Sequence, residues 1–175
     1  MISEERLREL EDIQEKFKYR FKDINLLNQS LTHKSYVNEN ASENLQDNER
    51  LEFLGDAVLS LVVSDYSINK FADGSEGDLT KIRAAVVSEA NLSLVAREME
   101  IGKFLLLGKG EIMTGGRDKT SLLANAFEAV LAAIFLDSGY KEVFQVIINI
   151  LNDKINKVAG YELHRDFKSE LQEFI

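Results

Sequence analysis

The chain contains no proline in its 175 residues, and its ten glycines are concentrated in a few short stretches. Proline is the residue that interrupts helices most strongly, whereas apolar residues recurring every three or four positions predict them. Such spacing starts after Ser3, a potential N-cap, and recurs in six further segments, at about 23–31, 48–70, 79–87, 92–100, 121–136 and 140–158. The sequence therefore predicts an all-α fold, with an irregular, glycine-rich loop at 102–119.

Composition narrows the class of protein further. A chain of this length with 45% hydrophobic residues fits one domain with a sizeable core. The absence of cysteine excludes disulfides, thiol nucleophiles and cysteine-based zinc sites, and two histidines argue against a histidine-rich metal site. The acidic N-terminus and the lack of an apolar run of about 18 residues predict a cytoplasmic protein without a membrane span. A net charge of −9, taken alone, argues against nucleic acid as a partner.

The sharpest local pattern is a stripe of carboxylates. Glu49, Glu52 and Asp56 are spaced by three and four residues, which on a helix places them within about 60° of one another. A solvated charged face is one interpretation of this spacing. However, Leu59 and Val63 continue the same stripe and have the character of core residues. Carboxylates that run toward an interior need a cation to neutralise them.

A second segment offers a matching pair of oxygen donors. Asn125 and Glu128 are three residues apart in a predicted helix that is otherwise rich in alanine, leucine and valine. If the two helices face each other, Glu52, Asp56, Asn125 and Glu128 form an all-oxygen cage of the kind that helical bundles use for divalent metals. Oxygen ligands without histidine or cysteine favour magnesium, manganese or calcium over zinc.

These segments also carry a resemblance to a known family. Residues 48–59, Asn-Glu-Arg-Leu-Glu-Phe-Leu-Gly-Asp-Ala-Val-Leu, resemble the signature of the ribonuclease III family, and residues 31–36, 76–84 and 115–137 resemble its other motifs in order and spacing. The resemblance implies a single helical endonuclease domain that forms a symmetric homodimer. It implies hydrolysis of double-stranded RNA with Mg²⁺, or Mn²⁺ in its place, giving 5′-phosphate and 3′-hydroxyl ends in rRNA and mRNA processing.

The resemblance also assigns roles to individual residues. Glu52, Asp56 and Glu128 match the family's essential acidic positions, all three as metal ligands and the last two as catalytic residues. Glu49 and Glu76 match further acids of its cleavage valley.

Position 125 departs from the family pattern, which commonly has Asp there as a metal ligand. Asn125 keeps a carbonyl oxygen that can bind a metal but removes one negative charge. Natural variation and an engineered change are both open explanations, and either one predicts weaker metal binding.

Two further residues bear on partners. Phe53 matches an aromatic residue that inserts into a socket of the partner subunit, with an ordinary core phenylalanine as the alternative. Arg117 follows Gly115 and Gly116, and could contact an RNA phosphate there, whereas a plain flexible loop is the simpler interpretation.

Residues 81–119 carry a net charge of +2, but residues 37–56 carry −5, so the acidic excess gathers around the predicted metal site.

The predicted organisation is an endonuclease domain at 1–160, followed at 161–175 by a linker and the start of a truncated double-stranded RNA-binding domain. His33 and Tyr36 are expected to be buried, hydrogen-bonded scaffold residues.

One alternative function is a catalytically weakened or inactive dimer that only binds duplex RNA, which Asn125 favours. Another is a di-iron bundle, but that class needs Glu-x-x-His pairs, and neither His33 nor His164 follows a glutamate by three.

Overall fold

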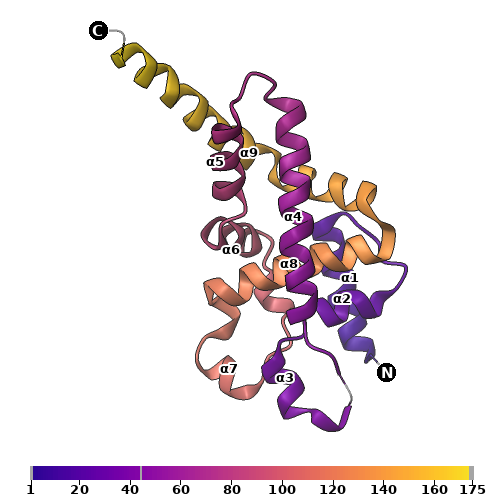
Figure 1. Cartoon of the computed structure of the whole chain (residues 1–175). Helices are drawn as coiled ribbons and strands as arrows, with labels where there is room; N and C mark the ends of the chain where they lie inside the picture. The colour runs from indigo at the N-terminus through magenta and orange to yellow at the C-terminus, as the bar shows by residue number, and fades with distance from the viewer. Residues whose placement is uncertain (1, 44, 174–175) are drawn as a thin grey trace.

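The computed structural model describes the backbone of residues 2–43 and 45–173, and the side chains of residues 2–42 and 45–162. This part of the chain folds into helices joined by short connections, without a strand (Figure 1). The all-α prediction is confirmed. The α-helices are α1 (Glu4–Phe17), α2 (Ile24–Ser30), α3 (Lys34–Glu39), α4 (Glu49–Lys70), α5 (Glu76–Val86), α6 (Glu89–Glu98), α7 (Lys109–Met113), α8 (Thr120–Ser138) and α9 (Tyr140–Glu173), with 3₁₀ turns at Ala41–Glu43 (η1), Ile101–Phe104 (η2) and Gly116–Asp118 (η3).

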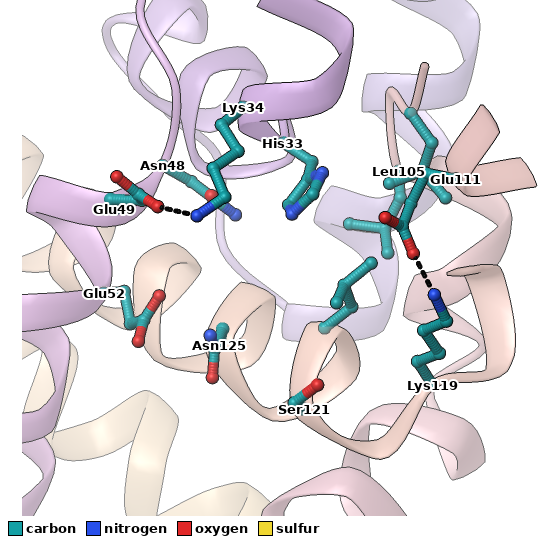
Figure 2. A pocket seen from close by; sticks show the side chains of 12 residues that line it. His33, Lys34, Asn48, Glu49, Glu52, Leu105, Glu111, Lys119, Ser121 and Asn125 are labelled. Carbon is teal, nitrogen blue, oxygen red and sulfur yellow. Dashed lines mark hydrogen bonds and ion pairs between the residues drawn. The ribbon is translucent and has the colours of Figure 1, made fainter. Parts of the chain in front are cut away.

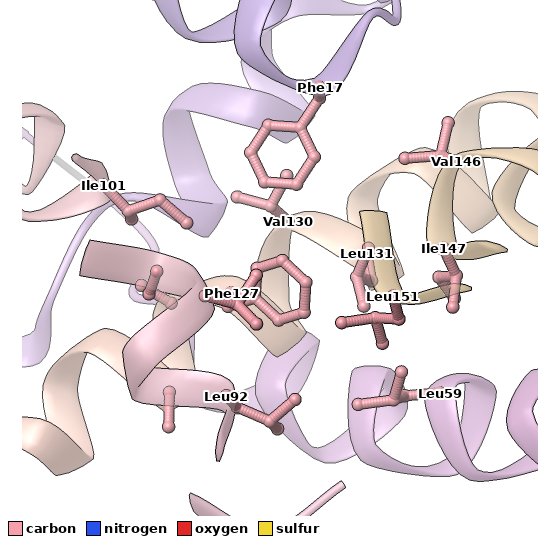
Figure 3. Close-up of a cluster of buried hydrophobic side chains, with 14 of the residues drawn as sticks. Phe17, Leu59, Leu92, Ile101, Phe127, Val130, Leu131, Val146, Ile147 and Leu151 are labelled. Carbon is pink, nitrogen blue, oxygen red and sulfur yellow. The ribbon is translucent and has the colours of Figure 1, made fainter. Parts of the chain in front are cut away.

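Helix α8 forms the centre of the fold. It crosses α4 and also packs against α2, α6 and α9 (Figure 1). Its Phe127 is fully buried and stacks on Phe17 of α1, with 6.0 Å between the ring centroids (Figure 3). By length and composition α8 could span a membrane, but 56% of its apolar window is buried inside the protein. Its apolar residues therefore form the core on which the other helices pack.

Several helix starts follow from local sequence. Ser3 caps α1 by accepting a hydrogen bond from the Arg6 amide, and Asp23 caps α2 in the same way. Ser75 and Asp78 form a reciprocal capping box at the start of α5. The predicted cap at Ser3 is confirmed.

The region 102–119 differs from the prediction of an irregular loop. It contains part of η2, then α7 and η3, and the earlier α3 was also missed. These helices have three to six residues, too few for an apolar repeat to show. Tertiary contacts hold them instead. Arg117 directs Nη1 at the carbonyl oxygens of Gly102, Lys103 and Leu105, at 2.7, 3.0 and 3.1 Å.

The predicted boundary at residues 160 and 161 lies within α9, whose backbone is helical on both sides of it. The side chains of 163–175, on which the expected start of an RNA-binding domain depends, lie outside the described residues. That part of the organisation stays a prediction.

Candidate active site

Helices α4 and α8 bring the predicted oxygen donors together. The two helices cross where Gly55 of α4 packs against the backbone of Glu128 in α8. A cavity of about 430 Å³ opens beside this crossing. The residues that line it are Glu49, Glu52, Phe53, Asp56, Asn125 and Glu128. The sequence predicted that all four proposed metal ligands would face one another, and in the structure they line one cavity.

The electrostatics of this cavity disfavour the ionised form of two of its carboxylates, Glu52 and Glu128. Burial raises the pKa of Glu128 to about 8, and repulsion from Asp56, Glu52 and Glu89 acts in the same direction. Burial and the neighbouring Glu49 also raise the pKa of Glu52. A divalent cation would reverse these shifts, because it favours the ionised form of every carboxylate around it.

The donor set fits a hard divalent cation in its chemistry. Carboxylate and amide oxygens are the ligands that magnesium and manganese prefer, and an open cavity leaves room for the water that magnesium retains. Among the described residues, however, no three carboxylate or imidazole groups converge into a preformed metal cluster. Mutual repulsion opposes the convergence of the carboxylates of Glu52, Asp56 and Glu128 when no cation is bound.

Asn125 has a specific local role in this arrangement. Its side chain hydrogen-bonds the carboxylate of Glu52, which lowers the pKa of Glu52 against the effect of burial. A neutral amide can donate such a bond, whereas an aspartate at the same place would add repulsion. Asn125 therefore stabilises the cavity when no cation is bound.

A second cavity, of about 370 Å³, adjoins the first and shares Glu49, Glu52 and Asn125 with it (Figure 2). Lys34 reaches Glu49 with 2.7 Å between Nζ and Oε1, and Lys119 reaches Glu111 with 2.5 Å between the corresponding atoms. His33 and Tyr36 were expected to be buried scaffold, yet both are only half-buried. His33 caps α3 and lines this second cavity.

The remaining predicted residues lie elsewhere. Glu76 begins α5, where its carboxylate accepts a hydrogen bond from Thr80 Oγ1 at 3.1 Å, and it does not line the cavity between α4 and α8. Arg117 is held by backbone carbonyls, and it lines a separate hollow with Arg97 and Lys103. Phe53 is 83% exposed, so the alternative of a core phenylalanine is wrong.

Sequence reasoning missed two residues that shape the site. Gly55 interrupts a strongly helical segment, and an isolated glycine in a helix is a signal of close packing that could have identified it. Lys34 pairs with Glu49 from 15 residues away on another helix, a relationship that no helical spacing reveals.

Comparisons with known proteins agree with this geometry. The Ribonuclease-III-like family profile matches residues 23–154. Ribonuclease 3 of Listeria monocytogenes is 47% identical over 165 residues, covering 94% of this chain and 72% of that protein. Ribonuclease 3 of Bacillus cereus is 51% identical over 162 residues, covering 93% and 66% respectively. The chain thus spans about two thirds to three quarters of these relatives' length.

Solved structures show the same fold. The nuclease domain of ribonuclease III from Campylobacter jejuni aligns with a TM-score of 0.76 at 41% identity, covering 82% of this chain and 96% of that one. Dicer from Pichia stipitis aligns with a TM-score of 0.58 at 27% identity, covering 78% and 57%. The matched region includes both helices of the cavity, and the chain belongs to the ribonuclease III family.

Proposed function

We propose that this protein is an endoribonuclease that hydrolyses phosphodiester bonds of double-stranded RNA with Mg²⁺, or with Mn²⁺ in its place. The observation that carries the proposal is the cavity between α4 and α8. It is lined by oxygen donors, and burial together with repulsion from neighbouring carboxylates raises the pKa of one of them, Glu128, to about 8. Membership in the ribonuclease III family supplies the reaction class.

Glu52, Asp56, Asn125 and Glu128 are the residues that would hold the cation, directly or through water. When bound, a divalent cation neutralises charge at the phosphate and makes water a better nucleophile near neutral pH. Asp56 and Glu128, from the two crossing helices, would orient the attacking water on one side of the phosphate. Hydrolysis with departure of the 3′ oxygen gives 5′-phosphate and 3′-hydroxyl ends.

The protein is proposed to act as a homodimer. Phe53, Leu61 and Ile68 are 83%, 57% and 64% exposed, and their spacing of eight and seven residues places them on one face of α4. A region involved in dimer formation is described for the Campylobacter jejuni nuclease domain. A twofold dimer presents one site to each strand of a duplex. Glu76 would join the cleavage valley only in that assembly.

RNA binding is proposed to depend on the A-form shape of the duplex and on its 2′-hydroxyls rather than on sequence. Three of the acids in residues 37–56, Glu49, Glu52 and Asp56, line the proposed metal cavity, where bound cations would offset their charge, while residues 81–119 carry a net charge of +2. This chain alone should bind duplex RNA weakly and with strong salt sensitivity. We propose that residues 161–175 lead toward an RNA-binding domain, and that the protein processes rRNA and mRNA in the cytoplasm.

A cleavage assay tests the function. An end-labelled RNA duplex is incubated with the protein over a magnesium titration, beside the Glu128→Gln variant and an EDTA control. Cleavage that requires the metal and is abolished in a folded, dimeric Glu128→Gln variant is expected. Cleavage by that variant at the normal rate would show that the metal assignment is wrong. Duplex binding without cleavage at any magnesium concentration would favour the catalytically inactive relative, the alternative that Asn125 supports.

A further inference from the structure

The second cavity has the size and lining of a binding site for part of a nucleotide. Its volume is about 370 Å³, within the range of small-ligand pockets, and Leu105, Leu107 and Leu122 provide an apolar wall. It shares Glu52 and Asn125 with the proposed metal site. An RNA strand whose phosphate lies at the metal site would therefore place a neighbouring sugar within reach of this cavity.

His33 presents a hydrogen-bond donor to this cavity. The amide of Ser35 donates to His33 Nδ1 at 3.2 Å, and Ser35 Oγ lies 2.8 Å from the same nitrogen. Ser35 Oγ itself accepts a hydrogen bond from the Gly108 amide at 2.9 Å, which leaves its proton free to point at Nδ1. Nδ1 is thus an acceptor, and the neutral imidazole carries its proton on Nε2.

The Nε2 atom is available to a ligand. Figure 2 shows the His33 ring between Lys34 and Leu105, extending into the cavity. Within the described part of the chain, Nε2 has no hydrogen-bond partner. Burial lowers the pKa of His33, so the ring is neutral near pH 7 and acts as an N–H donor to an oxygen acceptor.

The charge of the cavity indicates which oxygen atom of RNA accepts the hydrogen bond from His33. Two lysines and three glutamates line it with His33: Lys34, Lys119, Glu49, Glu52 and Glu111. Both lysines are already paired with glutamates, and the formal sum of +2 and −3 is −1. A second phosphate is disfavoured in such surroundings, whereas a neutral hydroxyl is not. In RNA the neutral oxygen next to each phosphate is the ribose 2′-hydroxyl, which DNA lacks.

We propose that this cavity receives the ribose adjoining the scissile phosphate, and that His33 donates its Nε2–H to the 2′-oxygen of that ribose. The inference rests on the proposed function and adds to it a structural basis for choosing RNA over DNA. His33 is here a substrate-binding residue, and it takes no part in proton transfer.

Single 2′-deoxy substitutions test the contact. They are placed, one at a time, at each position flanking the cleavage site in one labelled strand of an RNA duplex, and kcat/KM is measured for that strand. In the unmodified protein, the 2′-deoxy substitution at one of these positions should lower kcat/KM about five- to tenfold, which corresponds to the loss of one hydrogen bond. The His33→Asn variant should cut the all-ribose duplex about five- to tenfold more slowly than the unmodified protein does. In this variant, the 2′-deoxy substitution at the same position should not lower kcat/KM any further.

His33→Asn is chosen because asparagine is a good N-cap and can accept the bond from the Ser35 amide, while it has no atom in place of Nε2. Ser35→Ala is the matched control, since it removes the hydroxyl that contacts Nδ1 but leaves the imidazole. In this variant, the 2′-deoxy substitution at that one position should still lower kcat/KM. Unchanged thermal unfolding and an unchanged magnesium midpoint in His33→Asn separate the contact from damage to the fold or the metal site.

The outcomes distinguish the two proposals. If His33→Asn responds to every deoxy substitution as the unmodified protein does, His33 does not contact a 2′-oxygen, while metal-dependent cleavage still supports the proposed function. If the unmodified protein fails to cut the all-ribose duplex at any magnesium concentration, the proposed function is wrong, and so is this inference, which rests on it.

Discussion

The backbone of Gly55 in α4 lies directly against the carbonyl group of Glu128 in α8. A Cβ atom at position 55 would lie 2.0 Å from the carbonyl oxygen of Glu128 and 2.5 Å from its carbonyl carbon. Glu52 and Asp56 flank Gly55 in sequence, so this close approach brings carboxylates from both helices to one cavity. The separation of the two helices at the proposed active site is therefore set by a residue without a side chain.

Replacing Gly55 by alanine should force the helices apart. Alanine would favour the helix by about 1 kcal/mol, but overpacking against a rigid backbone costs about 1–3 kcal/mol or more. We expect Gly55→Ala to lower the melting temperature and to reduce RNA cleavage further than the loss of folded protein explains. Thermal unfolding and kcat/KM measured on the same preparation check this.

Gly160 provides the matched control for that variant. It lies in α9, and a Cβ atom there would have nothing within 4 Å. Gly160→Ala should leave cleavage unchanged and raise stability by about 0.5–1 kcal/mol. If Gly55→Ala were as stable and as active as Gly160→Ala, the close approach would not determine the geometry of the site.

The parts of this molecule that sequence could predict are those with a regular repeat. The spacing of Glu52 and Asp56 on one helix, and of Asn125 and Glu128 on another, placed all four on faces that could meet. The long helices were predicted for the same reason. Repeats of this kind depend only on helical geometry, which is local.

Contacts between residues that are distant in the chain leave no such repeat in the sequence. The short helices α3 and α7 contain too few residues for a periodic pattern, and side chains distant in sequence hold the region around them. The glycine neighbours of Arg117 predict a phosphate ligand, but its Nη1 is directed at three carbonyl oxygens from the preceding segment. An arginine in a glycine-rich loop looks the same in sequence in both roles.

Asn125→Asp should strengthen metal binding and weaken the protein without metal. The substitution adds a negative charge beside Glu52 and removes the amide that bonds to it. We expect the magnesium concentration for half-maximal cleavage to fall about tenfold, equivalent to about 1.4 kcal/mol, and the melting temperature in EDTA to fall. Ser121→Asp, which adds the same charge one helical turn away on α8, is the control. An equal effect of both changes would mean that Asn125 is not at the cation.

The stability of the protein without metal should decrease as pH rises toward 8, because of Glu128. Its pKa is near 4.5 when unfolded and about 8 when folded. Between these values the folded protein holds a proton that the unfolded chain has released, so rising pH favours unfolding. In EDTA, the stability advantage of Glu128→Gln over the unmodified protein should therefore grow from pH 5 to pH 8. Saturating magnesium should reverse that advantage, and melting curves with and without metal measure both effects.

Arg117→Met should destabilise the protein more than it weakens RNA binding. Methionine keeps the length of the side chain but loses the donors to the carbonyls of Gly102, Lys103 and Leu105, and leaving such groups unsatisfied costs about 1–3 kcal/mol. Lys103→Met is the control, because Lys103 is exposed and should change stability by less than about 0.5 kcal/mol. A dominant role of Arg117 in phosphate binding predicts the opposite: an unchanged melting temperature and a weaker salt dependence of RNA affinity.

Phe53→Ala should weaken the proposed dimer without unfolding the subunit. Phe53 is 83% exposed, so its removal creates no cavity in the core, whereas a buried aromatic anchor at an interface contributes about 2 kcal/mol or more to association. We expect the dimer dissociation constant to rise at least about thirtyfold in sedimentation equilibrium, with an unchanged circular dichroism spectrum. Met113 is 86% exposed on α7 and serves as the control for loss of an exposed apolar side chain. Equal weakening by Met113→Ala, or none by Phe53→Ala, would place the interface elsewhere than on this face of α4.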